Sequence, residues 1–247
     1  MIRVASALWW GLTLALLPVV LPQALWTKRT ALRLPPAAGD AYGLAGVELA
    51  GPCIKLLLVG ESTVAGVGVE LHEAALAAQL ARALSLRWQR PVAWRACGEN
   101  GVTAQQATER LLPHALAEPA DLALLVFGVN DSTHLSSLNG WDQSVRALAR
   151  PLLQQGIQVA FTGVPPLEHF SALPWLLRRL LGLRACLLDS HLRGLCEQLG
   201  ASHHSVQLQF SVDYLAVDGY HPSVLGYQVW AQSLAEQLPM PGASGGL

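Results

Sequence analysis

Short apolar runs alternate along the chain with longer segments in which apolar residues recur at helical spacing. The runs are typical of buried strands, which we expect at residues 54–59, 92–96, 122–127 and 157–162. The longer segments predict helices at residues 71–88, 104–116, 141–155, 185–199 and 223–238. Strands that alternate with helices of this length need crossover connections. The pattern therefore predicts an α/β fold with a mostly parallel sheet and helices on both of its faces.

The N-terminal 30 residues follow a different pattern. No charged residue lies between Arg3 and Lys28, and tryptophans occur near both ends of this apolar run. Because roughly 20 apolar residues are enough to span a bilayer, residues 1–30 are predicted to form a transmembrane or signal-anchor helix. Pro18 and Pro22 fit either a kinked spanning helix or the end of a signal peptide. An uncleaved single-pass anchor is favoured over a removed signal, because no Ala-x-Ala cleavage site stands out.

The residues that flank the apolar run bear on which side of the membrane the following part lies, and the composition of the remaining chain predicts its division into segments. Lys28, Arg29 and Arg33 outnumber Arg3, which by the positive-inside rule places the following part in the cytoplasm, whereas a signal-like interpretation exports it. Residues 31–53 are predicted to be a linker because they are rich in Pro, Gly and Ala. One domain over residues 54–239 and a flexible tail over residues 240–247 complete the predicted organisation.

Composition and charge exclude several classes of function. The net charge is -1, with 16 basic and 17 acidic residues, which gives no reason to expect a nucleic-acid partner. The four cysteines form no close Cys-x-x-Cys pair and no cluster with histidine at zinc spacing, so neither a metal site nor another cofactor is expected. Cys97 and Cys186 are predicted to be buried thiols. The sequence selects no disulfide pair and no oligomeric state.

Three of the expected strands end in polar residues or glycines that a plain connection would not need. The first leads into Gly60-Glu61-Ser62, the second into a loop containing Gly101, and the third into Gly128-Val129-Asn130-Asp131. Each of these has an ordinary explanation as a turn residue or as a glycine with a positive φ. In an open α/β sheet, however, ligands bind at the carboxyl ends of the strands, where loops and helix N-termini converge.

A fourth segment adds a base and its partner. Asp218 lies three residues before His221 in a loop just ahead of the last predicted helix, so its carboxylate can reach back to the imidazole. A serine hydroxyl is a weak nucleophile until an adjacent base removes its proton. His221 is therefore predicted to activate Ser62, and Asp218 to hold the ring in the required tautomer.

The same segments supply candidates for an oxyanion hole, which stabilises the negative charge of a tetrahedral intermediate. The candidates are the backbone N–H groups of Ser62 and Gly101 and the side-chain amide of Asn130. His203 and His204 lack comparable surroundings, and we interpret them as surface or packing residues.

The four segments, in this order, resemble the sequence blocks of the SGNH or GDSL hydrolases over about residues 54–238. The chain is most similar to the single-domain bacterial branch with thioesterase and lysophospholipase activities, because residues 101–106 and 218–222 follow its pattern. The resemblance implies a flavodoxin-like three-layer α/β/α sandwich. It also implies a catalytic triad of Ser62, Asp218 and His221 and an oxyanion hole of Ser62, Gly101 and Asn130.

The residues around the serine depart from the family pattern in one respect. Glu61 replaces the usual Asp, and Thr63 replaces the frequent Leu. Because the negative charge is kept with one extra methylene, we expect the hydrogen bonds of the turn to be re-formed. The change is expected to affect rate and substrate preference more than the triad.

The region after the fourth strand bears on the substrate. Residues 173–183 are rich in leucine, and they form either a lid or acyl-chain surface or an ordinary amphipathic helix packed on the sheet. Arg178, Arg179 and Arg184 suit a solvated face as well as anionic lipid.

Together these patterns favour a membrane-tethered serine hydrolase that cleaves carboxylic ester or thioester bonds of acyl or lipid-like substrates through an acyl-enzyme. A deacetylase or acyltransferase acting on envelope carbohydrate would use the same triad. A catalytically silent binding module at the membrane is the alternative from another class, since fold alone does not fix function. The presence of Ser62, Asn130, Asp218 and His221 together argues against that module.

Overall fold

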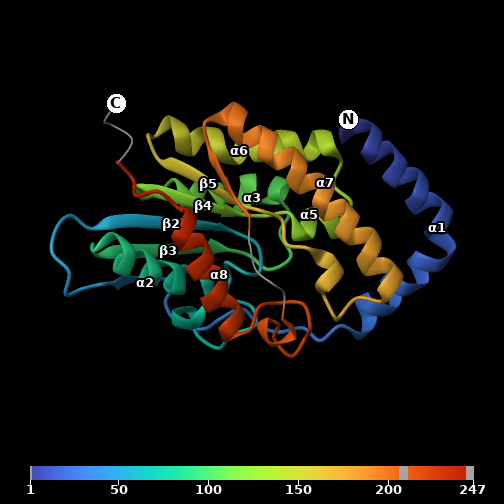
Figure 1. The fold of residues 1–247 in the computed structure, drawn as a ribbon, viewed down its shortest axis with the longest axis horizontal. Coiled ribbons are helices and arrows are strands. Elements are labelled where there is room, and N and C mark those ends of the chain that lie inside the picture. Colours follow the sequence, from blue (N-terminus) through green and yellow to red (C-terminus); the bar gives the residue numbers. More distant parts are fainter. Residues whose placement is uncertain (1, 206–210, 243–247) are drawn as a thin grey trace.

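Four strands form where the apolar runs lie, and in the described part of the chain they assemble with two further strands into one sheet in the order β1-β3-β2-β4-β5-β6 (Figure 1). The computed structural model describes residues 2–205 and 211–242. Five strands run parallel: β2 (Ile54–Gly60), β3 (Val92–Gly98), β4 (Leu122–Val126), β5 (Gln158–Thr162) and β6 (Ser202–His204). The edge strand β1 (Tyr42–Ala45) is antiparallel to β3. Apart from β1, this is the flavodoxin-like order, in which the chain winds outward in both directions from β2.

Helices cover both faces of the sheet, which confirms the three-layer α/β/α sandwich (Figure 1). One layer contains α2 (Leu76–Trp88) and α8 (Val224–Gln237). The other contains α3 (Ala104–Arg110), α6 (Leu138–Gln154) and α7 (Trp175–Leu199). Residues on β2 alternate between these layers, with Leu57 and Val59 in the core beneath α6 and α7 and with Leu56 and Leu58 in the core beneath α2 and α8.

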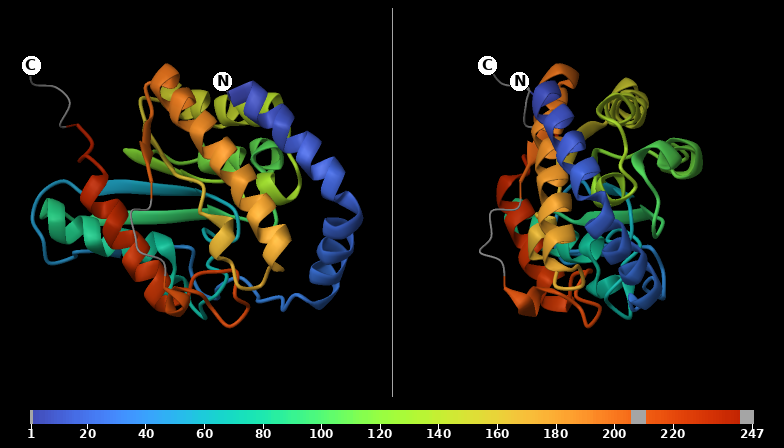
Figure 2. Two further views of the ribbon diagram at one scale, coloured as in Figure 1. Left: turned by 45° about the vertical axis from the view of Figure 1, so that its right-hand side comes forward. Right: turned by 90° about the vertical axis from the view of Figure 1, so that its right-hand side faces the viewer.

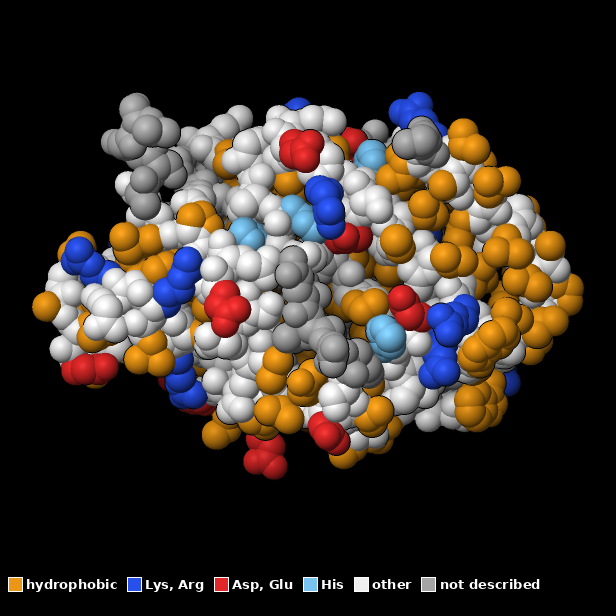
Figure 3. Space-filling model, viewed as in Figure 1, with side chains coloured by type: hydrophobic (Ala, Val, Ile, Leu, Met, Phe, Trp, Pro, Cys, Tyr) orange, Lys and Arg blue, Asp and Glu red, His pale blue; other side chains and the backbone are white. Residues whose placement is uncertain are grey.

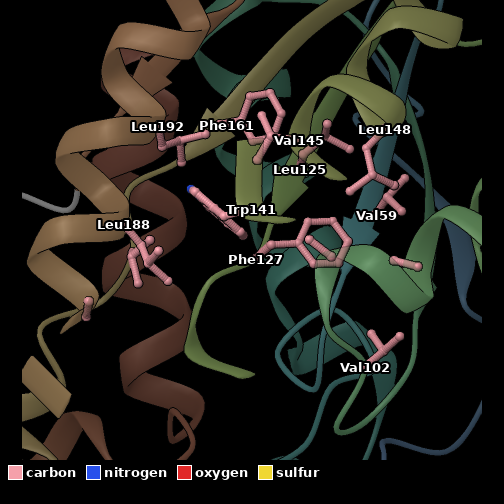
Figure 4. Packing of buried hydrophobic residues seen from close by; sticks show 14 of the residues in the cluster. Val59, Val102, Leu125, Phe127, Trp141, Val145, Leu148, Phe161, Leu188 and Leu192 are labelled. Atoms are coloured by element: carbon pink, nitrogen blue, oxygen red, sulfur yellow. The ribbon is translucent and has the colours of Figure 1, made fainter. Parts of the chain in front are cut away.

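The larger core is built around Trp141, which is fully buried (Figure 4). It lies among Phe127 at the end of β4, Phe161 on β5, and Leu188 and Leu192 on α7 (Figure 4). These residues fasten the helical layer to the same strands whose carboxyl ends carry the polar segments. The packing therefore holds those segments on a rigid support.

Several elements differ from the predicted boundaries. Residues 104–116 form α3 and a separate short helix, α4 (Leu112–Ala115), and residues 71–88 begin with a 3-10 turn, η1 (His72–Ala74). The predicted helix at residues 185–199 is the second half of α7, which begins at Trp175 and so includes the leucine-rich segment. Two further 3-10 turns are η2 (Leu167–His169) and η3 (Val212–Tyr214).

Three elements were absent from the prediction because none of them has a long apolar pattern. They are β1, β6 and the short helix α5 (Val129–Thr133). Residues 42–45, within the predicted linker 31–53, hydrogen-bond to β3 and are therefore part of the sheet. The predicted tail at residues 240–247 lies mostly outside the described residues. The prediction of a buried Cys186 was wrong: this thiol is exposed on α7, and Cys196, one turn from the end of that helix, is buried instead.

The N-terminal segment forms α1 (Ile2–Thr30), a single helix that is long and apolar enough to cross a membrane. It lies along α7, outside the helical layer (Figure 2). Trp9 and Val20 on its inner face are buried, whereas Leu8 and Leu14 on its outer face are 70% and 65% exposed. Figure 3 shows the resulting apolar surface over α1. The helix thus has one face packed on the domain and one apolar face that the described chain leaves uncovered.

Candidate active site

Ser62 lies in the turn that follows β2, at the carboxyl edge of the sheet. The turn is closed by hydrogen bonds from the Val64 N–H to the Glu61 carbonyl (3.0 Å) and from the Val67 N–H to the Ser62 carbonyl (3.0 Å). β2 lies between β3 and β4, so Ser62 is at the switch point from which the chain winds in both directions. Ligands bind at this position in open α/β folds. Ser62 is 8% exposed and lines a cavity of about 150 Å³.

The side chain of Glu61 joins this turn to the end of the neighbouring strand. One carboxyl oxygen accepts a hydrogen bond from the Val129 N–H (2.9 Å), and the other accepts one from the Asn130 N–H (2.7 Å). The glutamate therefore spans the distance to the next loop and bonds its backbone. Burial raises the pKa of Glu61 to about 8, against the opposing effect of the hydrogen bond from Asn130 and with a further increase from the charge of Asp131.

Asp218 and His221 are in direct contact, as their spacing predicts. The Asp218 Oδ2 and His221 Nδ1 atoms are 2.6 Å apart, and Asp218 Oδ1 accepts hydrogen bonds from the Tyr220 and His221 backbone N–H groups at 3.0 Å. Burial acts to raise the pKa of Asp218, but these hydrogen bonds outweigh it and hold the pKa below its usual range. His221 lines the same cavity as Ser62, and its Nδ1 contacts the Asp218 carboxylate.

Asn130 lies in α5, immediately after the turn that follows β4. Gly128 precedes this helix with a φ of 121°, and a Cβ atom there would be 2.5 Å from a Val164 methyl group, so only glycine fits. The Asn130 amide donates a hydrogen bond to the Val102 carbonyl at 3.0 Å. This bond ties α5 to the loop that contains Gly101, which has a positive φ of 84°. The structure thus brings these two segments together, although neither Gly101 nor Asn130 is among the described residues that line the cavity.

The cavity wall is mostly apolar, and most of its residues were not predicted from the sequence. Phe170 packs edge-on against Tyr220 at 4.9 Å between ring centroids, and Tyr220 packs against the His221 ring at 5.2 Å. Burial raises the pKa of Tyr220 above its usual range, so its hydroxyl stays neutral. Further wall residues come from the end of β4 and from separate loops and helices: Val126, Phe127, Val129, Pro165, Pro166, Leu215 and Trp230. Because they are far apart in sequence, no local pattern identifies them as a group.

Asp131 is a buried carboxyl group next to Asn130 for which the sequence predicts no separate role. It is 1% exposed, accepts hydrogen bonds from the Ala104 N–H (2.9 Å) and the Ser136 hydroxyl (2.7 Å), and has a pKa raised by burial despite these bonds.

His203 and His204 are packing residues: the His203 ring bonds Asp189 at 2.9 Å, and His204 is buried on β6.

The described residues contain no group of three or more His, Cys, Asp or Glu side chains that could hold a metal ion. All four cysteines, Cys53, Cys97, Cys186 and Cys196, are free thiols.

Comparison with known proteins identifies one family. The sequence model of the GDSL-like Lipase/Acylhydrolase family matches residues 58–229, which is more than half of the chain. No similar sequence was found among curated proteins.

Solved structures with the same fold have low sequence identity to the chain. The lipase/acylhydrolase from Enterococcus faecalis is 18% identical with a TM-score of 0.61, over 74% of this chain and 94% of that one. TesA is 19% identical with a TM-score of 0.59, over 74% of this chain and 97% of its own. The acetyl xylan esterase AlAXEase is 15% identical with a TM-score of 0.61, over 75% of this chain and 100% of its own. At these identities the likeness concerns the fold.

Proposed function

Because the chain belongs to the GDSL-like lipase/acylhydrolase family, we propose that it is a serine hydrolase that cleaves carboxylic ester or thioester bonds of acyl or lipid-like substrates. Ser62 is the proposed nucleophile, His221 the general base, and Asp218 the group that orients the imidazole. The observation that carries this proposal is the 2.6 Å contact between Asp218 and His221 at a cavity that Ser62 also lines.

In the proposed reaction, His221 takes the Ser62 proton as the hydroxyl oxygen attacks the carbonyl carbon of the substrate. Since Asp218 binds Nδ1, the proton is taken by Nε2, and the ionised carboxylate stabilises the imidazolium that forms. The same imidazolium then protonates the leaving alcohol or thiol. Water activated by His221 releases the acyl group from Ser62, which restores the starting state.

The negative charge of the tetrahedral intermediate needs hydrogen-bond donors. We propose the Ser62 and Gly101 backbone N–H groups and the Asn130 amide for this role. One amide N–H of Asn130 donates to the Val102 carbonyl, which fixes the plane of the group and leaves its second N–H to be the proposed donor. Glu61 supports this placement by binding the Asn130 backbone.

The cavity supports an apolar acyl group as the part of the substrate that is recognised. Its wall includes Phe127, Phe170 and Trp230, and an apolar cavity of this volume is large enough for a group of about the size of benzene. A short acyl chain would be enclosed, whereas a longer one would have to extend beyond the cavity. A carbohydrate deacetylase is the second candidate, because one structural neighbour is an acetyl xylan esterase and an acetyl group would also fit.

The proposal includes attachment to a membrane through α1. The outer face of this helix exposes Leu8, Leu14 and Trp26, and no charged residue lies between Arg3 and Lys28. Such a surface is stabilised by lipid rather than by water. We propose that the helix is retained as an uncleaved anchor, which would hold the cavity close to a source of lipid-like substrates.

The test is active-site labelling of the full chain in detergent with a fluorophosphonate probe. We expect labelling of the wild type and of Ser190→Ala, a control on the exposed face of α7, and no labelling of Ser62→Ala. A panel of p-nitrophenyl esters from acetyl to palmitoyl then separates small-acyl from lipid-like preference. A folded wild type that neither reacts with the probe nor turns over any ester would refute the hydrolase and favour a silent binding module.

A further inference from the structure

Arg184 is a charged residue in an apolar setting. It lies on the face of α7 that also carries Leu177, Leu180, Leu181 and Leu188, and it is 0% exposed. Burial lowers the pKa of its guanidinium, while the charge of Asp131 acts in the opposite direction. Removing a guanidinium from water is costly unless it is paired and hydrogen-bonded. The prediction that Arg184 lies on a solvated or lipid-facing surface was therefore wrong, and its partners need an explanation.

Part of this burial comes from the N-terminal helix. The Arg184 Nη1 donates to the Ser6 hydroxyl at 3.3 Å, and the guanidinium lies 5.1 Å from the centre of the Trp9 ring and 5.9 Å from that of Trp10. These are the distances of cation–π contacts. The Trp9 indole N–H also donates to the Leu180 carbonyl at 2.8 Å, which fixes α1 against α7. A helix serving only as a tether would need none of these contacts.

The other side of the guanidinium contacts the loop that follows α5. Arg184 Nη2 donates to the Ser136 carbonyl, three residues beyond the end of α5. The Ser136 hydroxyl donates to one carboxyl oxygen of Asp131, and the other oxygen accepts the Ala104 N–H. Asp131 directly follows Asn130, and Ala104 lies three residues after Gly101. These hydrogen bonds, joined through Ser136 and through the backbone next to Asn130 and Gly101, thus link α1 to both segments of the proposed oxyanion hole.

We propose that Arg184 is a positioning residue that couples the docking of α1 to the placement of Asn130 and the Gly101 loop. This inference rests on the proposed function. It means that α1 contributes to the order of the active site. With the helix docked, Arg184 is held against the Ser136 carbonyl, and this contact fixes α5. With the helix removed or displaced, water reaches Arg184, and the hydrogen bond that orders α5 weakens.

The experiment compares full-length variants in detergent, with kcat and KM for a short-chain p-nitrophenyl ester and amide hydrogen exchange as the two readouts. Arg184→Met removes the charge, and Arg184→Lys keeps the charge but not the planar guanidinium group. Trp9→Ala removes the indole ring by which α1 covers Arg184. Arg179→Met and Thr30→Ala are the matched controls, since both residues are exposed on the same two helices. Circular dichroism establishes that each variant is folded.

We expect Arg184→Met and Trp9→Ala to lower kcat about ten- to hundredfold with KM within about twofold of wild type, as for a misplaced transition-state contact. Arg184→Lys should recover part of kcat, and the controls should match the wild type. The double variant should be no slower than Arg184→Met alone, because both changes act through one path. Amide exchange should increase at residues 129–136 in both single variants.

A folded Arg184→Met variant with wild-type kcat and wild-type exchange at residues 129–136 overturns the coupling. If the reductions in kcat multiply in the double variant, Trp9 acts independently of Arg184, and the coupling of α1 to α5 through Arg184 is refuted. Were Arg184→Met not to fold, Trp9→Ala and Arg184→Lys test the same path. If the wild type is not labelled at Ser62, the proposed function fails, and the exchange data alone then decide whether α1 orders α5 through Arg184.

Discussion

The buried carboxyl group of Glu61 makes the stability of this protein depend on pH. Glu61 is 3% exposed, and burial raises its pKa from 4.5 to about 8. Between these two pH values the folded protein keeps a proton on Glu61 that the unfolded chain releases. Its contribution to stability is therefore fully present below pH 4.5 and is lost as the pH rises through about 8. At 1.36 kcal/mol per pKa unit, the loss over this window is about 5 kcal/mol.

Glu61→Gln removes this titration while keeping the shape of the side chain. The amide offers one acceptor oxygen to the two N–H groups of Val129 and Asn130, so one buried donor loses its partner. That loss costs about 1–3 kcal/mol and is independent of pH. The variant should therefore be less stable than the wild type at pH 5, and the gap should close or reverse by pH 8.5.

The assay is urea unfolding of the full chain in detergent, followed by tryptophan fluorescence at pH 5, 6.5 and 8.5. Asp131, whose pKa is also raised by burial, gives both proteins a slope of the same sign, so the difference between them reports Glu61 together with its coupling to the charge of Asp131. Glu109→Gln, at an exposed position on α3, is the control and should follow the wild type. Parallel stability profiles for wild type and Glu61→Gln across this range would refute the reasoning.

Two further predictions concern the oxyanion hole and the membrane. Asn130→Ala should lower kcat roughly a hundredfold with little change in KM, because the amide is used chiefly in the transition state. Steady-state kinetics test this prediction. An unchanged kcat would show that Asn130 is not part of the oxyanion hole. The full chain should remain in the membrane fraction after alkaline carbonate extraction and keep its N-terminal sequence, because the outer face of α1 is apolar. Release into the soluble fraction, or an N-terminus that begins after α1, would contradict the proposed anchor.

The local pattern predicted the parts of the fold in which each residue's role depends on its sequence neighbours. The four apolar runs became β2, β3, β4 and β5, and the amphipathic segments became helices of both layers. The contact between Asp218 and His221 also follows from spacing, since three residues in a tight loop bring the two side chains together. The hydrogen bonds of the turn are re-formed by Glu61, as we expected, but burial keeps its carboxyl group protonated up to about pH 8, so the expected negative charge is not what holds them.

The sequence pattern did not predict the surroundings of a residue where these are set by contacts with residues far away in the chain. Arg184 is the clearest case, because its spacing from Leu177, Leu180 and Leu188 places it on the buried face of α7, yet its charge suggested a surface position. The signal was present in the helical spacing but was outweighed by residue type. The contacts with α1 and with the Ser136 carbonyl together explain how the charge is accommodated.

The sequence by itself determined the order of strands and helices, the α/β class, the family and the apolar N-terminal helix, because hydrophobic periodicity and short motifs are properties of neighbouring residues. The tertiary structure decided which strand ends meet, which side chains wall the cavity beside Ser62, and that α1 lies against α7. These depend on contacts between segments more than a hundred residues apart, such as Trp9 with Leu180 and Ser6 with Arg184. Burial then sets the pKa of Glu61 and the role of Arg184, since the cost of a charge depends on the whole of its surroundings.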